Sequence, residues 1–171
     1  RIHSRGHEIG LHPSYGTFQT PELIKNEAER LRAACKMAGT EQKSYGGRMH
    51  YLRWEHPTTL QAWEDAGMHY DTTLSYADRP GFRCGSCFEY PAFNPVTQEL
   101  LNIRIRPLIA MECTIIAERY MNLGYSEAAL SKFIELKNSC RQVNGCFTLL
   151  WHNSHFTNKE DFELYERVIK Y

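Results

Sequence analysis

Two histidines in this chain follow short segments that we interpret as buried strands. His12 comes after the segment 6–11, and His152 comes after the apolar run 146–151. In α/β proteins, the loops at the carboxyl ends of strands hold most of the catalytic groups. An imidazole at such a place can bind a metal ion or transfer a proton near neutral pH. These two positions are therefore the first candidates for a functional site.

Four segments share a pattern with one enzyme family. Their sequences are Gly-His-Glu-Ile-Gly-Leu-His at 6–12, Gly-Gly-Arg-Met-His-Tyr at 46–51, Ala-Gly-Met-His-Tyr-Asp-Thr-Thr-Leu at 66–74 and Cys-Phe-Thr-Leu-Leu-Trp-His-Asn at 146–153. The segments resemble motifs of the polysaccharide deacetylases of the NodB-homology type, carbohydrate esterase family four, and they occur in the family's order. The resemblance spans nearly the whole chain.

The resemblance implies a role for several residues. His12 is then a zinc ligand, and His152 is the general acid that protonates the leaving amine. Arg48 holds the carboxylate of the catalytic base in a bidentate pair, and Asp71 helps to orient the arginine. Asp78 is the alternative candidate to Asp71 for orienting Arg48. The backbone N–H near Tyr51 would join the metal in stabilising the oxyanion.

The chain departs from the family in two places. The family's first motif, a strand that ends in a pair of aspartates, finds no room upstream of His12, so we expect this chain to be a piece of a longer protein. The family's second metal histidine follows the first by four residues, and that position is Gly16. We predict His50 as the replacement ligand; the alternative is that His50 lines the sugar-binding groove. His155 and His7 are lesser candidates.

Aromatic residues near these motifs are candidates for binding a sugar ring. Tyr51 and Trp54 follow Arg48, and Tyr76 opens the stretch 75–102, which is rich in proline, glycine and aromatics. We expect that stretch to be irregular and to form part of the substrate groove. The alternative is that these aromatic side chains belong to the core.

Together these features predict a metal-dependent hydrolase that removes N-acetyl groups from a sugar of a surface polysaccharide or its precursor. The expected cofactor is a divalent metal ion, Zn²⁺ before others, and the expected partner is the carbohydrate substrate. The alternative is a non-catalytic carbohydrate-binding or scaffolding domain that keeps the fold. Gly16 favours this alternative, whereas the combination of His12, Arg48 and His152 favours the enzyme.

Helical and strand patterns alternate along the chain. Helices are expected at 21–38, 58–67, 126–143 and from 157 onward, and strands at 6–11, 45–48, 68–74, 101–105 and 146–151. Alternation of this kind predicts a mainly parallel sheet covered by helices. The family resemblance adds an irregular (β/α) barrel whose first strand lies upstream of this chain. We expect residues 1–171 to form a single domain.

Composition excludes some classes of function. The 171 residues carry zero formal net charge, so no basic surface for nucleic acid is expected. No apolar run approaches the roughly 20 residues that span a bilayer, and no signal peptide is visible. The six cysteines are scattered, which favours reduced thiols and a cytoplasmic location. Cys84-Gly-Ser-Cys87 is expected to be a pair of loop cysteines.

Overall fold

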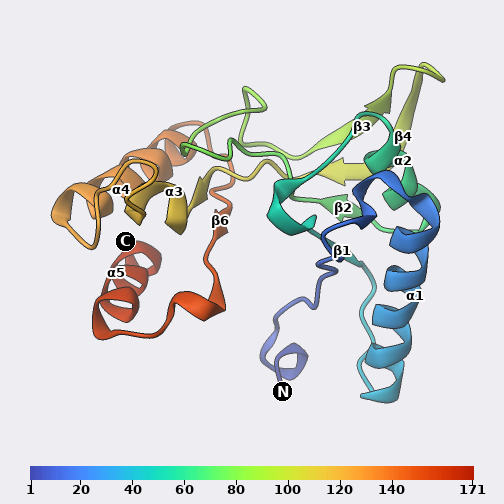
Figure 1. The fold of residues 1–171 in the computed structure, drawn as a ribbon, viewed down its shortest axis with the longest axis horizontal. Coiled ribbons are helices and arrows are strands. Elements are labelled where there is room, and N and C mark those ends of the chain that lie inside the picture. The colour runs from blue at the N-terminus through green and yellow to red at the C-terminus, as the bar shows by residue number, and fades with distance from the viewer. The chain divides into compact units, whose positions relative to one another are not determined.

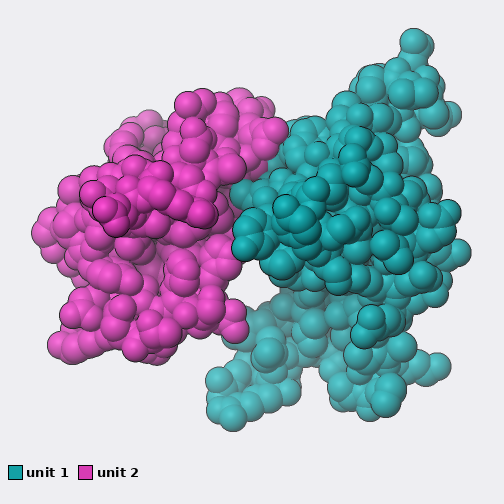
Figure 2. Space-filling model, in the orientation of Figure 1, with its two compact units in different colours: residues 1–74, 89–106 teal, residues 75–88, 107–171 magenta.

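The computed structural model describes residues 1–171, which form two compact units (Figure 2). Unit 1 comprises residues 1–74 and 89–106, and unit 2 comprises residues 75–88 and 107–171. The chain therefore passes between the units at three points. A unit assembled from separate segments need not fold alone, so the count of one domain stays a prediction.

Two helices of unit 1 form where the sequence predicts them. They are α1 (Pro21–Met37) and α2 (Thr58–Asp65). Proline in the first turn of α1 suits a position whose N–H has no partner within the helix. Gly39, with a φ of +63°, lies just beyond the end of α1. Three short 3₁₀ turns complete the helical part of this unit: η1 (His3–Arg5), η2 (Thr17–Gln19) and η3 (His50–Leu52).

A four-stranded sheet forms the rest of unit 1 (Figure 1). Its order is β1 (Gly46–Gly47), β2 (Tyr70–Asp71), β4 (Glu99–Ile105) and β3 (Tyr90–Asn94). β1, β2 and β4 are parallel, and only β3 is antiparallel. Leu101, Ile103 and Ile105 are buried on one face of β4, as their alternation predicts.

Two expectations about unit 1 are wrong in part. The segment before His12 is not a full strand: only Leu11 forms a parallel bridge, to Gly47, and the backbone of Ile9 bonds the Gln42 side chain instead. The stretch 75–102 is not irregular throughout, because β3 pairs with β4 as a hairpin. Pro91 lies where the register of that pairing shifts, a place where a strand tolerates proline.

Unit 2 packs two helices over a small parallel sheet (Figure 1). The helices are α4 (Glu127–Gln142) and α5 (Lys159–Lys170). The shorter elements are β5 (Ala110–Met111), α3 (Glu112–Ile116), β6 (Leu149–Leu150) and the 3₁₀ turn η4 (Asn153–His155). Phe133 of α4 is fully buried in the core, and Trp151 stacks on it at 5.8 Å between ring centroids.

Side-chain caps begin both long helices of unit 2. The Ser126 hydroxyl accepts a hydrogen bond from the N–H of Ala129 at 3.3 Å, as the sequence predicts for α4. For α5 the cap is Asn158, whose side-chain oxygen accepts from the N–H of Asp161 at 2.8 Å. The helix begins at Lys159, two residues after the predicted start at 157.

The fold is mixed α/β with mostly parallel strand pairs, as predicted. The two sheets do not close into a barrel, and the barrel form stays a prediction. No helix in the structure combines the length and the apolar composition that crossing a membrane requires.

Candidate functional site

Unit 1 brings together three of the predicted site residues. His12 follows the bridge residue Leu11, while Arg48 and His50 follow β1, the strand that Leu11 pairs with. The ring centroids of His12 and His50 lie 4.9 Å apart. Residues separated by 36 and 38 positions in the sequence thus meet at the carboxyl end of β1.

The hydrogen bond of His12 fixes which ring nitrogen carries its proton. Nδ1 lies 2.7 Å from the carbonyl oxygen of Arg48. Because a carbonyl only accepts, Nδ1 is the donor, and in the neutral ring Nε2 carries the lone pair. A backbone carbonyl that orients an imidazole in this way is the usual support of a metal-binding histidine. His12 therefore has the tautomer that its predicted role needs.

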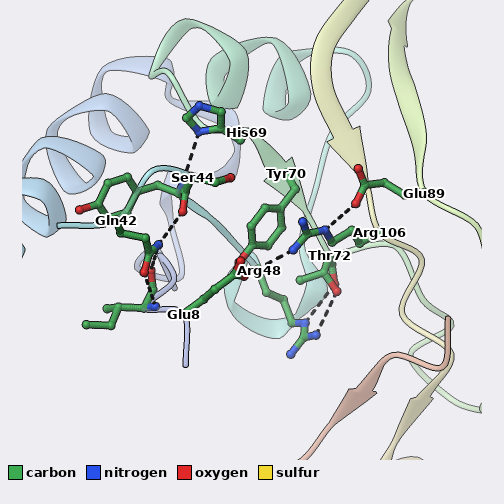
Figure 3. A network of polar contacts seen from close by, with 11 residues as sticks. Glu8, Gln42, Ser44, Arg48, His69, Tyr70, Thr72, Glu89 and Arg106 are labelled. Carbon is green, nitrogen blue, oxygen red and sulfur yellow. Dashed lines mark hydrogen bonds and ion pairs between the residues drawn. The ribbon is translucent and has the colours of Figure 1, made fainter. Parts of the chain in front are cut away.

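The end of β2 holds the side chain of Arg48 (Figure 3). Its Nε donates to the carbonyl oxygen of Thr72 and its Nη2 donates to the hydroxyl of the same residue, both at 3.0 Å. Two bonds to one residue fix the plane of the guanidinium. Arg48 is thus an oriented cation at the end of β2 rather than a mobile surface side chain.

Asp71 is buried at the end of β2, next to Thr72. Its two carboxylate oxygens accept hydrogen bonds from the N–H of Thr73 at 2.9 Å and from the hydroxyl of Thr73 at 2.5 Å. Burial raises the pKa of Asp71 to about 6, although the bonds from Thr73 and the charge of Arg48 act in the opposite direction. The influence of Arg48 on this pKa agrees with the predicted proximity of the two residues.

A second set of contacts around the same sheet is structural. Tyr70 donates its hydroxyl to Glu8 at 2.7 Å, and the Arg106 guanidinium lies over the Tyr70 ring at 3.6 Å (Figure 3). Arg106 also pairs with Glu89 at 2.6 Å. These contacts tie the segment before His12 to β2 and to the start of the β3–β4 hairpin.

The loop after His50 adopts a strained backbone. Tyr51 and Leu52 have φ values of +58° and +54°, a region that residues with a β-carbon rarely occupy. Tyr51 is 72% exposed, and Tyr15 lies edge-on to it with 5.5 Å between ring centroids. The strained turn thus presents an aromatic side chain to solvent directly beside His50.

The other two predicted sugar-binding aromatics lie elsewhere. Trp54 is half-buried in unit 1 and meets His56 edge-on at 5.5 Å. Tyr76 belongs to unit 2, where it is half-buried beneath the Arg79 guanidinium. Tyr51 is therefore the most exposed of the three, and a role in sugar binding stays a prediction for all of them.

Unit 2 contains a separate cluster around the predicted general acid, His152. The Glu112 carboxylate, which is fully buried, contacts Nδ1 of His152 and lies 2.9 Å from Nδ1 of His155. The backbone N–H of His152 donates to the same oxygen, Oε1, at 3.1 Å. Ligand atoms of all three residues lie within 4.8 Å of one another, so this group can hold a metal ion.

The parallel pair β5 and β6 explains why the cluster forms. Met111 is in register with Leu150, so the residues just beyond both strands lie at the same edge of the sheet. Glu112 follows β5 directly, and His152 comes two residues after β6. The turn η4 then returns His155 to the same place, with its N–H bonded to the carbonyl of His152 at 3.0 Å.

Glu112 is the functional candidate that the sequence analysis missed. It lies within the run Leu108-Ile-Ala-Met-Glu-Cys-Thr-Ile-Ile116, where it is the only charged residue. An ionisable side chain inside an apolar run is rarely buried without a partner. The sequence thus indicates that Glu112 needs a partner, but it does not predict which residue that is. The contact with His152 depends on the pairing of β5 with β6.

Comparison with known proteins does not identify a family. No protein-family model matches the chain, and no curated protein matches it either. The functional argument therefore rests on the two clusters themselves and on the motifs that the sequence shows.

Proposed function

We propose that this chain is a metal-dependent hydrolase that removes N-acetyl groups from a sugar of a surface polysaccharide or its precursor. The observation that carries the proposal is the meeting of His12, Arg48 and His50 in unit 1. The sequence motifs predicted these residues for one site, and their rings and backbone are in contact there. An irregular (β/α) barrel of the NodB-homology type, completed by a strand upstream, is part of the proposal.

The residues of unit 1 fit a divalent metal ion. The Nδ1 of His12 contacts the carbonyl oxygen of Arg48, and the ring of His50 lies beside His12. Such an ion supplies Lewis acidity, which polarises an acyl oxygen and lowers the pKa of an attacking water. The family resemblance implies carboxylates as the further ligand and as the catalytic base. Zn²⁺ is the expected ion, because imidazole and carboxylate ligands suit it.

Arg48 and Asp71 would position the catalytic base. The guanidinium of Arg48 is oriented by Thr72 and can bind a carboxylate in bidentate fashion. Asp71 is buried close enough to Arg48 for the arginine's charge to lower the pKa of the aspartate. The sequence motifs assign protonation of the leaving amine to His152, which contacts Glu112 in unit 2. All six cysteines are free thiols, which supports a reducing compartment, and we place the reaction in the cytoplasm.

The metal content of the purified protein tests this proposal. Elemental analysis of the wild type is compared with His12→Ala and His50→Ala, and with His7→Ala as the control, an exposed histidine of the same segment. We expect the first two variants to lose about one equivalent of metal and His7→Ala to keep it. Acetate release from N-acetylglucosamine oligomers should fall at least about 100-fold with that loss.

Two results would contradict the proposal. One is a wild-type protein without metal after purification in zinc-containing buffer. The other is metal that both His12→Ala and His50→Ala retain at the wild-type level while the far-ultraviolet circular dichroism spectrum is unchanged.

A carbohydrate-binding domain without activity is the second candidate. The exposed pair Tyr15 and Tyr51 favours it, because amphipathic aromatic side chains at a surface are suited to contacts with ligands. Gly16 also favours it, since the expected second metal histidine is missing there. Binding of N-acetylglucosamine oligomers that persists in His12→Ala and falls in Tyr51→Ala, together with a metal-free wild type, would support this candidate.

A further inference from the structure

The two oxygens of the Glu112 carboxylate differ in how many polar contacts they make. Three nitrogens surround Oε1: the backbone N and Nδ1 of His152, and Nδ1 of His155. The other oxygen, Oε2, is buried and has no hydrogen-bond partner. The backbone N of His152 donates to Oε1, whereas each Nδ1 is a donor only in the tautomer that carries its proton there, and the lone pairs of Oε2 are unused in either case. Hydrogen bonding alone does not account for this arrangement.

A buried carboxylate of this kind needs a compensating charge. Glu112 is fully inaccessible to solvent, and burying a charge without full pairing costs several kcal/mol. The two imidazoles face it from one side, and each is about two-fifths exposed. A cation placed between the two Nδ1 atoms and the carboxylate would balance the charge of Glu112 and accept a lone pair from each imidazole.

The chemistry of the three ligands selects the class of ion. Two imidazoles and one carboxylate form a set that binds Zn²⁺ and other first-row divalent ions. One ion bound at about 2 Å from each ligand atom fits atoms that lie within 4.8 Å of one another. Hard ions such as Mg²⁺ and Ca²⁺ prefer sites made of oxygen alone, so they fit less well.

An open pocket of about 170 Å³ in unit 2 reaches this cluster through His155. Ser154, Tyr125 and Asp161 also line it. The Asp161 side chain is nearly fully buried, and its Oδ1, like Oε2 of Glu112, has no hydrogen-bond partner. The pocket thus offers water or a small ligand a route to the coordination positions that protein atoms leave open.

We propose that Glu112, His152 and His155 bind a divalent transition-metal ion in unit 2, with its open coordination positions facing this pocket. The carboxylate and the two Nδ1 atoms are the ligands. This site is composed entirely of unit 2 residues, and it does not depend on the proposed function of unit 1. It assigns His152 to the metal and replaces the proton-donor role that the sequence motifs suggest for this residue.

Zn²⁺ and Co²⁺ are suitable probes for the site. The whole chain is stripped with chelator and titrated with each ion, and bound metal is measured by elemental analysis. Co²⁺ adds a visible absorption band that reports its coordination. We expect at least a tenfold loss of Zn²⁺ affinity at this site, with loss of the Co²⁺ band, in Glu112→Gln and in His155→Ala. The control His7→Ala should keep both signals, and His12→Ala should keep the Zn²⁺ binding step that Glu112→Gln and His155→Ala remove.

Two variants keep the test falsifiable. Glu112 is in the core, so Glu112→Gln can fail to fold, whereas His155 is partly exposed and its replacement should leave the metal-free circular dichroism spectrum unchanged. Retention of metal in His155→Ala, with no change in Zn²⁺ affinity or in the Co²⁺ band, would overturn the proposal and leave Glu112 and His152 as a proton-transfer pair. If His12→Ala loses metal while His155→Ala retains it, the result contradicts the metal site of unit 2 but not the proposed metal site of unit 1.

Discussion

At the scale of single residues, Asp71 makes the stability of the protein depend on pH. Its pKa in the folded protein is about 6, above the ordinary value of 3.8, because burial opposes ionisation. A raised pKa means that the favourable contribution is present at low pH and is lost as the pH rises through 6. Ionised Asp71 should then cost up to about 3 kcal/mol of the free energy of unfolding above pH 6.

Asp71→Asn should therefore flatten the pH profile of stability. Urea unfolding between pH 4 and pH 7 measures the free energy of unfolding, and we expect the wild type to lose more of it over this range than the variant. Asp78→Asn, at an exposed aspartate, serves as the control and should keep the wild-type slope. Parallel profiles for the wild type and Asp71→Asn would show that the buried carboxyl of Asp71 is not the source of the pH dependence.

The sequence predicted site residues where they belong to a recognisable motif. His12 and Arg48 were predicted from the resemblance to the deacetylase motifs, with His50 as the candidate replacement ligand, and the structure brings the three residues together. Glu112 was not predicted, because its partners His152 and His155 lie 40 and 43 residues further along the chain. A local pattern carries no information about a contact that only strand pairing creates.

At the scale of the elements, β1 can pair with the segment before His12 only because both residues of β1 are glycines. A β-carbon on Gly47 would lie 1.9 Å from the carbonyl oxygen of Leu11. That oxygen accepts a hydrogen bond from the N–H of Arg48 at 2.9 Å, and the N–H of Leu11 donates to Gly46 at 2.8 Å. The close approach of these two backbones places His12 next to the residues that follow β1.

Gly47→Ala should separate the two backbones. The overlap with Leu11 involves main-chain atoms that cannot rotate away, so we expect a loss of at least about 2 kcal/mol in the free energy of unfolding. The metal that we propose for His12 should be lost in the same variant. Gly16→Ala is the control: its β-carbon meets nothing within 4 Å, and its φ of −88° suits alanine. Equal urea midpoints for both variants would contradict the argument.

The long elements were predictable and the short ones were not. Helices α1, α4 and α5 have apolar faces and recognisable ends, and the structure confirms them. β1, β2, β5 and β6 contain two residues each, too few for a period to be visible. The hairpin β3–β4 was missed in part because Pro91 and Pro95 flank Phe93, and prolines argue against a strand.

At the scale of the whole molecule, the order of segments along the chain determines which fragments contain all the parts of a unit. Each unit is assembled from two stretches of chain, because residues 89–106 of unit 1 interrupt unit 2. The fold class followed from the alternation of helices and strands, since that pattern depends on local sequence. The division into two units did not follow, because it depends on which distant segments pack together.

The contacts of residues 75–88 indicate that residues 107–171 do not fold alone. Cys87 is buried in the core of unit 2, and Phe82 packs against that core. Backbone hydrogen bonds join Gly81 to Ile109 at 2.8 Å and Cys146 to Cys87 at 3.2 Å. A fragment that starts at residue 107 would expose the surface that these contacts cover.

Comparison of two fragments tests this argument. The fragment 75–171 retains every segment of unit 2, whereas 107–171 lacks the first one. We expect the longer fragment to melt cooperatively by circular dichroism at 222 nm, and the shorter one to show reduced helicity and a broad transition, because α4 and α5 then lose part of the core they pack on. Equally sharp melting of both fragments would mean that residues 75–88 contribute little to unit 2, and that the core around Phe133 is sufficient by itself.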